Sequence, residues 1–241
     1  MNRLTDCILY ERYEELERLL KEEKLDPNSR SHEDHGGYTV LIYSSYSGNI
    51  RTSSILLRYG AGINLLTNEG ATALTAAIVS CKLELAHFLL QNGADPNIYE
   101  KNQWSPLSMA ARDGSLKLVE SLLYTGARVN DGLQYTSSYS LFWAVYNRHI
   151  NVARLLLQKG ANVDSANYWR ETPLMITTMK PFRRMLYLLL EYKADVFITD
   201  VNGKRAIEKT TDWYMRDFLQ QVESYQESLF GRLFIQLRYD F

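Results

Sequence analysis

The sequence predicts an all-α repeat solenoid, in which short units of two helices stack on one another. A motif centred on an aliphatic residue recurs at nearly equal intervals, with anchors at Leu41, Leu74, Leu107, Leu141, Leu174 and Ile207. A Leu-Leu pair begins at the same distance after each of the first five anchors, at Leu56, Leu89, Leu122, Leu156 and Leu189. A period of about 33 positions indicates stacked repeats, none of which buries its apolar face alone. Such an array favours binding over catalysis.

One unit, residues 105–130, shows how each repeat is expected to fold. Ser105 can cap a helix, and Pro106 stands at its first position, where the missing N–H is not needed. The polar break at 113–115 ends this helix. A second helix follows, with Leu116, Val119, Leu122 and Leu123 at helical spacing. Gly126 supplies a left-handed C-terminal cap.

Composition narrows the classes of function. The chain has 241 residues and a net charge of −1, from 27 Lys plus Arg and 28 Asp plus Glu. It therefore lacks the overall positive charge that would attract nucleic acid or anionic lipid. No apolar run reaches the ~18 residues that span a bilayer, and the charged N-terminal stretch contains no secretory segment. We expect a cytoplasmic protein, or one that is nuclear or delivered into a host cell by a pathogen.

The repeated motif resembles the ankyrin repeat. The order Thr-Pro-Leu-x-x-Ala-Ala, helix break, Leu-Leu-x-x-Gly-Ala-x-x-Asn is typical of that family, and the Gly-Ala ending recurs at Gly60, Gly93, Gly126 and Gly160. The resemblance implies units of two antiparallel helices joined by β-hairpin fingers. It covers residues 36–222, as five full units and a C-terminal partial unit. Residues 1–35 are expected to form an N-terminal capping repeat and a long first finger.

Several positions depart from the family's pattern. The Gly between the two helices is replaced by Cys81, Arg148 and Pro181, and Lys193 replaces the capping Gly of the fifth full unit. Phe197 stands where the finger Asn is expected. These departures predict less regular helix packing in the C-terminal third.

The last segment, residues 223–241, lies beyond the repeats and is rich in apolar side chains. One interpretation is a cap that covers the end of the stack, because solenoid ends need such elements. The other is a docking segment for a second protein. Both remain open from the sequence.

Candidate catalytic chemistry is sparse. His32 and His35 lie in the polar first finger and are candidate metal ligands, but their polar surroundings favour a solvated loop. Cys7 and Cys81 are single thiols that we expect to be buried in apolar packing. No phosphate-binding Gly-rich loop, His-Glu-x-x-His helix or Cys-x-x-Cys pair occurs. We expect no catalytic residue, no metal and no cofactor; the alternative is an enzyme with a cryptic site.

The resemblance also indicates where a partner binds. In ankyrin-like stacks, the positions six, five and three residues before each anchor and five and six residues after it face a concave surface. These positions are bland near Leu74 and rich in aromatic and Arg side chains later, where the predicted contacts are Trp104, Arg112, Tyr135, Tyr146, Tyr168 and Trp169. Such side chains dominate binding hot spots. The alternative is that Trp104 and Trp169 only stiffen neighbouring fingers; Trp143 is expected in the core.

A basic cluster adds a second candidate contact. Lys180, Arg183 and Arg184 lie close together in the sequence and could meet an acidic partner or a phosphate. The predicted function is a monomeric, non-catalytic protein–protein interaction module with a protein partner, and with no nucleic acid or membrane as ligand. The alternative is an adaptor that joins two proteins and uses 223–241 as its second docking site.

Overall fold

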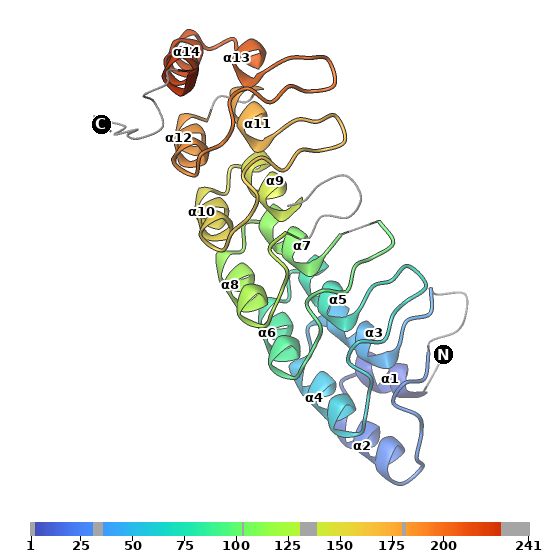
Figure 1. Cartoon of the computed structure of the whole chain (residues 1–241). Coiled ribbons are helices and arrows are strands. Elements are labelled where there is room, and N and C mark those ends of the chain that lie inside the picture. Colours follow the sequence, from blue (N-terminus) through green and yellow to red (C-terminus); the bar gives the residue numbers. More distant parts are fainter. Residues whose placement is uncertain (1–2, 31–35, 103, 131–138, 180–181, 228–241) are drawn as a thin grey trace. The chain divides into compact units, whose positions relative to one another are not determined.

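The computed structural model describes residues 3–30, 36–102, 104–130, 139–179 and 182–227. They belong to two compact units, Met1–Asp131 and Gly132–Phe241. The described residues of each unit form pairs of short helices joined by loops (Figure 1). The all-α repeat architecture expected from the repeat period is therefore confirmed.

The described residues of the first unit form four helix pairs, which lie in sequence order within the unit. Their bounds are α1 (Arg3–Leu9) with α2 (Tyr13–Lys21), α3 (Val40–Ser47) with α4 (Ile50–Arg58), α5 (Ala73–Val79) with α6 (Leu83–Gln91), and α7 (Pro106–Arg112) with α8 (Leu116–Tyr124). The pair α1 and α2 lies within residues 1–35, for which a capping repeat stays a prediction.

In the part of the second unit that the structure describes, there are three helix pairs. Their bounds are α9 (Tyr139–Tyr146) with α10 (Ile150–Gln158), α11 (Pro173–Met179) with α12 (Arg183–Glu191), and α13 (Ala206–Lys209) with α14 (Trp213–Glu227). The last pair is atypical, because α13 has only 4 residues whereas α14 has 15.

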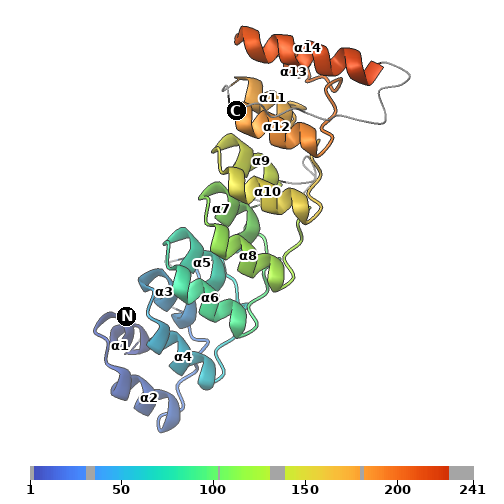
Figure 2. The ribbon, with the colours of Figure 1, turned by 90° about the vertical axis from the view of Figure 1, so that its left-hand side faces the viewer.

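Within each unit the first helices of the pairs form one row and the second helices form another (Figure 2). Small side chains allow the first row to pack closely: Ala76, Ala77, Ala110 and Ala111 are all buried. The leading leucines of the Leu-Leu pairs, such as Leu89, lie with no exposed surface in the second row. The recurring apolar residues of successive repeats therefore form one continuous core within each unit, as stacked repeats require.

Side-chain caps start the first helices. The Thr39 side chain accepts a hydrogen bond from the Ile42 amide at the start of α3. Capping boxes form where Thr72 pairs with Thr75 and where Ser105 pairs with Ser108. Each cap satisfies amide groups that have no partner inside the helix. The cap expected at Ser105 is confirmed.

Non-glycine residues adopt the left-handed conformation at the departures from the family's pattern. Cys81, Arg148 and Lys193 have φ values of 56°, 65° and 64°, in the region that Gly48 and Gly126 occupy at equivalent positions. The turns therefore keep their shape, and the less regular packing predicted from these substitutions is not seen there. Pro181 lies outside the described residues. The expectation that both thiols are buried is wrong for Cys81, which is exposed, whereas Cys7 is buried.

The fingers are tight turns more than extended hairpins. Backbone hydrogen bonds close them, from the Thr67 amide to the Ala71 carbonyl at 2.9 Å and from the Asp200 amide to the Lys204 carbonyl at 3.0 Å. Among the described residues, β-pairing is limited to one isolated antiparallel bridge between Arg30 and Thr39. Short fingers leave room for little more than the turn itself.

The expected boundary after residue 222 falls inside α14, which continues to Glu227. Val222 and Glu223 are both buried. The Glu223 carboxylate accepts a hydrogen bond from the Arg205 guanidinium at 3.1 Å. Residues 228–241, which form most of the predicted capping or docking segment, lie outside the described residues.

Candidate functional site

Hydrogen bonds between backbones fix neighbouring finger tips within each unit. In the first unit the Asn68 amide donates to the Gly36 carbonyl at 2.8 Å, and the Lys101 amide donates to the Glu69 carbonyl at 3.0 Å. In the second unit the Val201 amide donates to the Trp169 carbonyl at 3.0 Å. Side chains on adjacent tips are therefore held at a constant spacing.

The finger bases are fixed by polar residues that recur at one position of the period. Oδ1 of Asn64 accepts from the Asp95 amide at 2.9 Å, and Oδ1 of Asn97 accepts from the Arg128 amide at 2.9 Å. Asp164 accepts in the same way from the Asp195 amide at 2.9 Å. These side chains are occupied by the framework and do not face a partner.

In the first unit the two predicted contacts, Trp104 and Arg112, lie together. The guanidinium carbon of Arg112 is 5.1 Å from the centre of the Trp104 ring. Asp113 accepts two hydrogen bonds from Arg112, at 2.7 and 3.3 Å, and this side-chain hydrogen bonding raises the pKa of Arg112. Trp104 is half-buried. The Trp104 ring is therefore partly covered by Arg112, whose positive charge is paired with the carboxylate of Asp113.

In the second unit Tyr146 ends α9 within an aromatic cluster. Its ring stacks on Phe142 at a centroid distance of 6.0 Å and meets Trp143 edge-on at 5.5 Å. Tyr146 is exposed, whereas Trp143 is half-buried. Trp143 was expected in the core; its position next to Tyr139 and Tyr146 at the end of a short helix leaves part of the ring outside it. Tyr135 lies outside the described residues.

Tyr168 and Trp169 form the most exposed aromatic pair among the predicted contacts. Their exposed fractions are 69% and 59%, and their rings meet edge to face at a centroid distance of 6.0 Å. The Asn167 side chain accepts hydrogen bonds from the Trp169 and Glu171 amides at 3.0 and 2.9 Å. The finger backbone is thus held by its own side chain while the two rings remain largely in solvent.

Two further apolar side chains of the second unit are exposed. Val201, which is 54% exposed, lies on the next tip and donates its amide to Trp169. Met179 is also exposed, at the end of α11. Val201 occupies the position six residues before the last anchor, so the rule for contact positions finds it when the rule is extended to Ile207.

A buried ion cluster lies beneath the same two fingers. Nζ of Lys209 is 2.8 Å from Oε1 of Glu171 and 2.7 Å from Oδ2 of Asp200. The hydrogen bond from Lys209, followed by the one from the Lys204 amide, lowers the pKa of Asp200 to about 2. One lysine is therefore shared by both finger carboxylates and compensates one of their two negative charges.

The predicted basic cluster is only partly available to a ligand. Arg183 forms an ion pair with Asp212 at 3.1 Å and lies 4.3 Å from the centre of the Tyr214 ring. Tyr214 in turn contacts the Tyr187 hydroxyl at 3.1 Å. Arg184 is exposed, and Lys180 lies outside the described residues. Arg183 therefore serves to join α12 to the start of α14.

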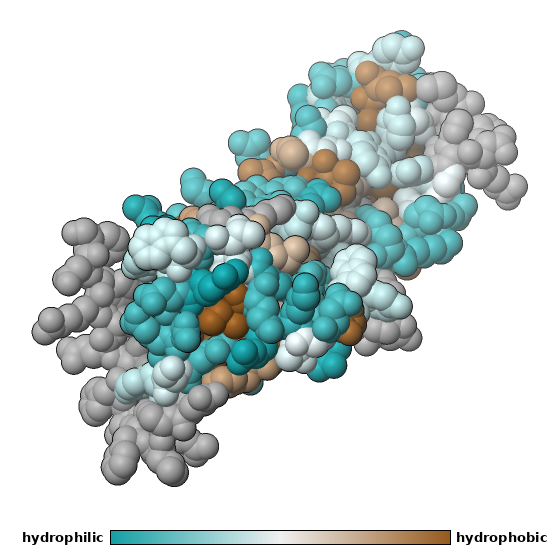
Figure 3. All heavy atoms as spheres, turned by 90° about the horizontal axis from the view of Figure 1, so that it is seen from above, coloured by the Kyte–Doolittle hydropathy of each residue, from teal (hydrophilic) through white to brown (hydrophobic). Residues whose placement is uncertain are grey.

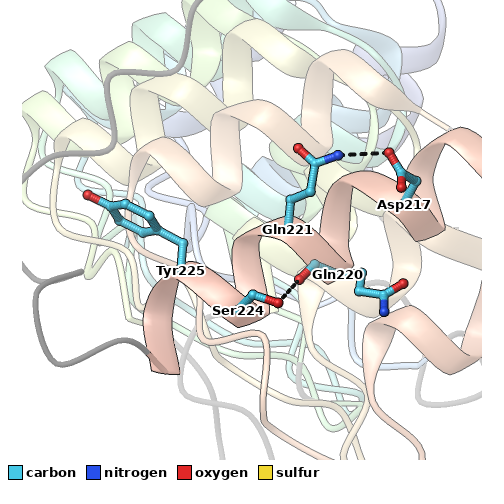
Figure 4. A pocket seen from close by; sticks show the side chains of 5 residues that line it. All are labelled: Asp217, Gln220, Gln221, Ser224 and Tyr225. Carbon is cyan, nitrogen blue, oxygen red and sulfur yellow. Dashed lines mark hydrogen bonds between the residues drawn. The ribbon is translucent and has the colours of Figure 1, made fainter.

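The outer face of α14 carries a shallow polar depression (Figure 4). It is lined by Asp217, Gln220, Gln221, Ser224 and Tyr225. The Gln221 amide donates to Asp217 at 2.8 Å, and the Ser224 hydroxyl donates to the Gln220 carbonyl at 2.9 Å. In the nearer part of Figure 3, which views this end from above, the surface is mainly hydrophilic. The opposite side of α14 buries Met215 and Leu219. A helix with this polarity can terminate a stack of repeats.

One large side chain on α14 was missed by the sequence analysis. Trp213 is 77% exposed and meets Tyr214 edge to face at 6.0 Å. It lies after the last anchor, where the period no longer assigns positions, so no signal in the repeat could have found it.

Neither a metal centre nor a membrane-spanning helix is found among the described residues. These residues contain no group of three or more His, Cys, Asp or Glu side chains that could hold a metal ion, and His32 and His35 lie outside them. In the part of the chain that the structure describes, no helix has the length and apolar character needed to cross a membrane.

Comparison with known proteins gives a consistent picture. The family model for ankyrin repeats (3 copies) matches residues 4–100 and 84–167. An ankyrin repeat protein of Rickettsia felis is 46% identical over 70 residues, which are 29% of this chain and 30% of that protein. The palmitoyltransferase ZDHHC17 of Homo sapiens is 37% identical over 137 residues, 56% of this chain and 22% of that enzyme. The chain therefore spans less than a third of the length of these relatives.

A solved structure also matches the fold. The human ASB11 ankyrin repeat domain superposes with a TM-score of 0.74, covering 92% of this chain and 97% of that one, at 23% sequence identity. At this identity the match concerns the arrangement of helices alone.

Proposed function

Because the chain belongs to the ankyrin repeat family, we propose that it is a non-catalytic module that binds a partner protein through its finger tips and the first helices of its repeats. Ankyrin repeats are typically protein-binding elements, and function on a shared fold is decided by the side chains of the site. In the first unit these are Trp104 and Arg112. In the second unit they are Tyr146, Tyr168 and Trp169.

The observation that carries this proposal is the exposed pair Tyr168 and Trp169 on a finger whose backbone is fixed. Large aromatic side chains on the surface of a monomer are unfavourably exposed to water until a partner covers them. In interfaces, truncation of such a side chain weakens the binding free energy by about 2 kcal/mol or more. The finger is already ordered by Asn167 and by the hydrogen bond from Val201 to Trp169. Binding therefore requires little further loss of backbone entropy.

The exposure of these rings also bears on the alternative in which the tryptophans only stiffen the fingers. Trp169 contacts the next finger through its carbonyl, so that contact does not depend on the indole ring. Trp104 is half-buried and lies against Arg112, which fits both roles. We therefore assign the stronger contribution to the second unit.

The two-partner alternative would use residues 223–241 as a second docking site. Glu223 is buried and paired with Arg205, and the outer face of α14 is polar. These observations favour a cap for residues 223–227.

The exposed free thiol of Cys81 fits a protein that acts inside cells, in the cytoplasm or the nucleus, because an oxidising compartment would oxidise such a thiol.

Affinity capture with matched variants tests the proposal. Wild-type protein and the Trp169→Ala and Trp213→Ala variants serve as bait in a eukaryotic lysate, and bound proteins are compared by mass spectrometry. Trp213 is the control because it is the same residue type and is more exposed than Trp169, but belongs to α14 and not to a finger. We expect a partner that is lost with Trp169→Ala and kept with Trp213→Ala, at unchanged melting temperature. Retention of every partner by Trp169→Ala would contradict the assignment.

A further inference from the structure

We propose that the tips of the last two fingers, through Tyr168, Trp169, Arg170, Val201 and Lys204, bind an acidic segment of the partner protein that also carries large apolar side chains. We call these five residues the tip surface. The inference rests on the proposed function, because it names the chemistry of the partner at the same finger surface.

The apolar half of the tip surface comes from three side chains on two adjacent fingers. Tyr168, Trp169 and Val201 are each more than half exposed. The hydrogen bond between the Val201 amide and the Trp169 carbonyl, 3.0 Å long, holds the two tips side by side. Such a surface accommodates one or two large apolar side chains from an extended segment.

The charge of the tip surface depends on which charged groups the two finger carboxylates contact. Residues 165–172 and 198–205 contain two acidic side chains, Glu171 and Asp200. Both are bound by Lys209 from below, at 2.8 and 2.7 Å. Lys209 therefore compensates one of the two negative charges inside the protein, and the other carboxylate oxygens accept hydrogen bonds from the Asn167 side chain and the Lys204 amide.

Two cations remain on the outer side. Arg170 and Lys204 are exposed, and within the described residues neither forms an ion pair with a carboxylate. Arg170 has a φ of 58°, so its side chain leaves a left-handed turn directly beside Trp169. The tip surface therefore combines exposed aromatic rings with two cations that outnumber the one negative charge left beneath them, which is complementary to an acidic and apolar segment.

In the described part of the first unit, the finger at residues 66–70 lacks this combination. There Lys101 pairs with Glu69 at 3.7 Å, so positive and negative charges alternate on the same tips. Leu66 is exposed on that finger, but an aromatic pair like Tyr168 and Trp169 is missing from residues 66–70. The preference for an acidic segment is consequently specific to the second unit.

A protein segment fits this surface better than a nucleic acid. Phosphate backbones are held by several cations at once, and affinity grows with the number of phosphates neutralised. The tip surface offers two cations, on a chain whose net charge is −1. Two carboxylates next to a Phe, Leu or Trp side chain would use both cations and the aromatic rings together.

A peptide selection tests the inference with the intact chain. A phage library of random dodecapeptides is selected on wild-type protein, after depletion on the Trp169→Ala variant. We expect the enriched peptides to combine Asp or Glu with Phe, Leu or Trp. An enriched peptide, labelled with a fluorophore, is then titrated with each variant, and its anisotropy gives the dissociation constant.

Charge variants decide the outcome. Arg170→Asn removes the charge and keeps a residue that tolerates the left-handed turn, and Lys204→Gln removes the second charge. The double variant is expected to bind about five- to tenfold more weakly, which corresponds to about 1–1.4 kcal/mol for the two exposed ion pairs together. Lys159→Gln, which removes an exposed cation at the end of α10, is the control and leaves binding unchanged.

The failures of the two proposals can be told apart. If Trp169→Ala abolishes peptide binding but the enriched peptides carry no excess of acidic residues and the charge variants bind as wild type, the inference is wrong and the proposed function stands. If a single-stranded oligonucleotide binds the tip surface more tightly than the enriched peptide, the inference is also wrong. If peptides bind Trp169→Ala as well as wild type, both are wrong at this surface.

Discussion

Asp164 stands where the repeats of the first unit use Asn, and Asp164→Asn is expected to stabilise the second unit. Burial of the carboxyl group raises the pKa of Asp164; the hydrogen bond from the Asp195 amide opposes this shift, and repulsion by the Asp195 carboxylate adds to it. The folded protein therefore holds this charge less favourably than the unfolded chain.

The equivalent residue Asn97 shows what an amide gains at this position. Its Oδ1 accepts from the Arg128 amide at 2.9 Å, and its Nδ2 donates to the Gly126 carbonyl at 3.0 Å. A carboxylate can make only the first of these bonds. In Asp164→Asn the new Nδ2 would donate to the Lys193 carbonyl, two residues before Asp195 just as Gly126 is two residues before Arg128.

The magnitude follows from these two contributions. One additional hydrogen bond contributes about 0.5–1.5 kcal/mol, and removal of a half-buried charge acts in the same direction. We expect at least about 1 kcal/mol at pH 7, which corresponds to about 2–4 °C in melting temperature for a protein of this size.

The effect has a defined pH dependence. Because the folded-state pKa of Asp164 is raised, wild-type stability falls as pH rises from the unfolded value of ~3.9 through the folded value. The variant escapes this loss, so its advantage appears above that window. At pH 3 the protonated Asp164 can itself donate to the carbonyl, and the two proteins should melt at similar temperatures.

Thermal melts by circular dichroism at pH 3, 5 and 7 measure the difference, and the reverse change Asn97→Asp in the first unit is the matched control. Asn97→Asp should destabilise by a similar amount at pH 7. An Asp164→Asn variant that melts at or below the wild-type temperature at pH 7 would refute the reasoning.

Three further predictions concern stability. Lys193→Gly and Arg148→Gly relieve side chains at φ values of 64° and 65° and should each raise the free energy of unfolding by about 0.5 kcal/mol in urea titrations, the relief exceeding the added entropy of the unfolded chain; a loss of stability in both would contradict the strain argument. Asp200→Asn removes a carboxyl with a pKa of about 2, whose contribution is present above ~4 and lost as pH falls through 2, so melting temperature should depend less on pH there than in wild type, and equal slopes would argue against the ion cluster. Leu189→Ala, at a side chain with no exposed surface, should cost about 2–5 kcal/mol by the same titration, and a cost below about 1 kcal/mol would show that its pocket collapses freely.

The framework was predictable from the sequence because the framework is what repeats. Each anchor and Leu-Leu pair faces the same neighbours in every unit, so one physical requirement recurs along the chain. The capping box at Ser105 and the left-handed cap at Gly126 could be predicted from single residues because they depend only on local backbone geometry. The turn at Cys81 was harder, since its side chain could have been buried or exposed with the same backbone.

The candidate site was less predictable because its decisive contacts join distant segments. Nothing in the spacing of Arg183 and Asp212 indicates that they form an ion pair. This pair compensates the charge of one of the three residues in the predicted basic cluster. The neutralisation of Glu171 by Lys209, 38 residues away, is equally invisible in sequence. The boundary expected after residue 222 fell inside a helix because α14 follows its own amphipathic pattern once the period has ended.

The backbone hydrogen bonds between finger tips restrict how any partner can bind. The Val201 amide already donates to the Trp169 carbonyl, and Asn68 and Lys101 use their amides in the same way. A partner strand therefore cannot extend these tips by pairing with those donors, as it could at an open sheet edge. Discrimination must come from side chains alone. Point substitutions at the tips can then change the choice of partner while the supporting backbone stays the same, which makes this surface open to rapid divergence between related proteins.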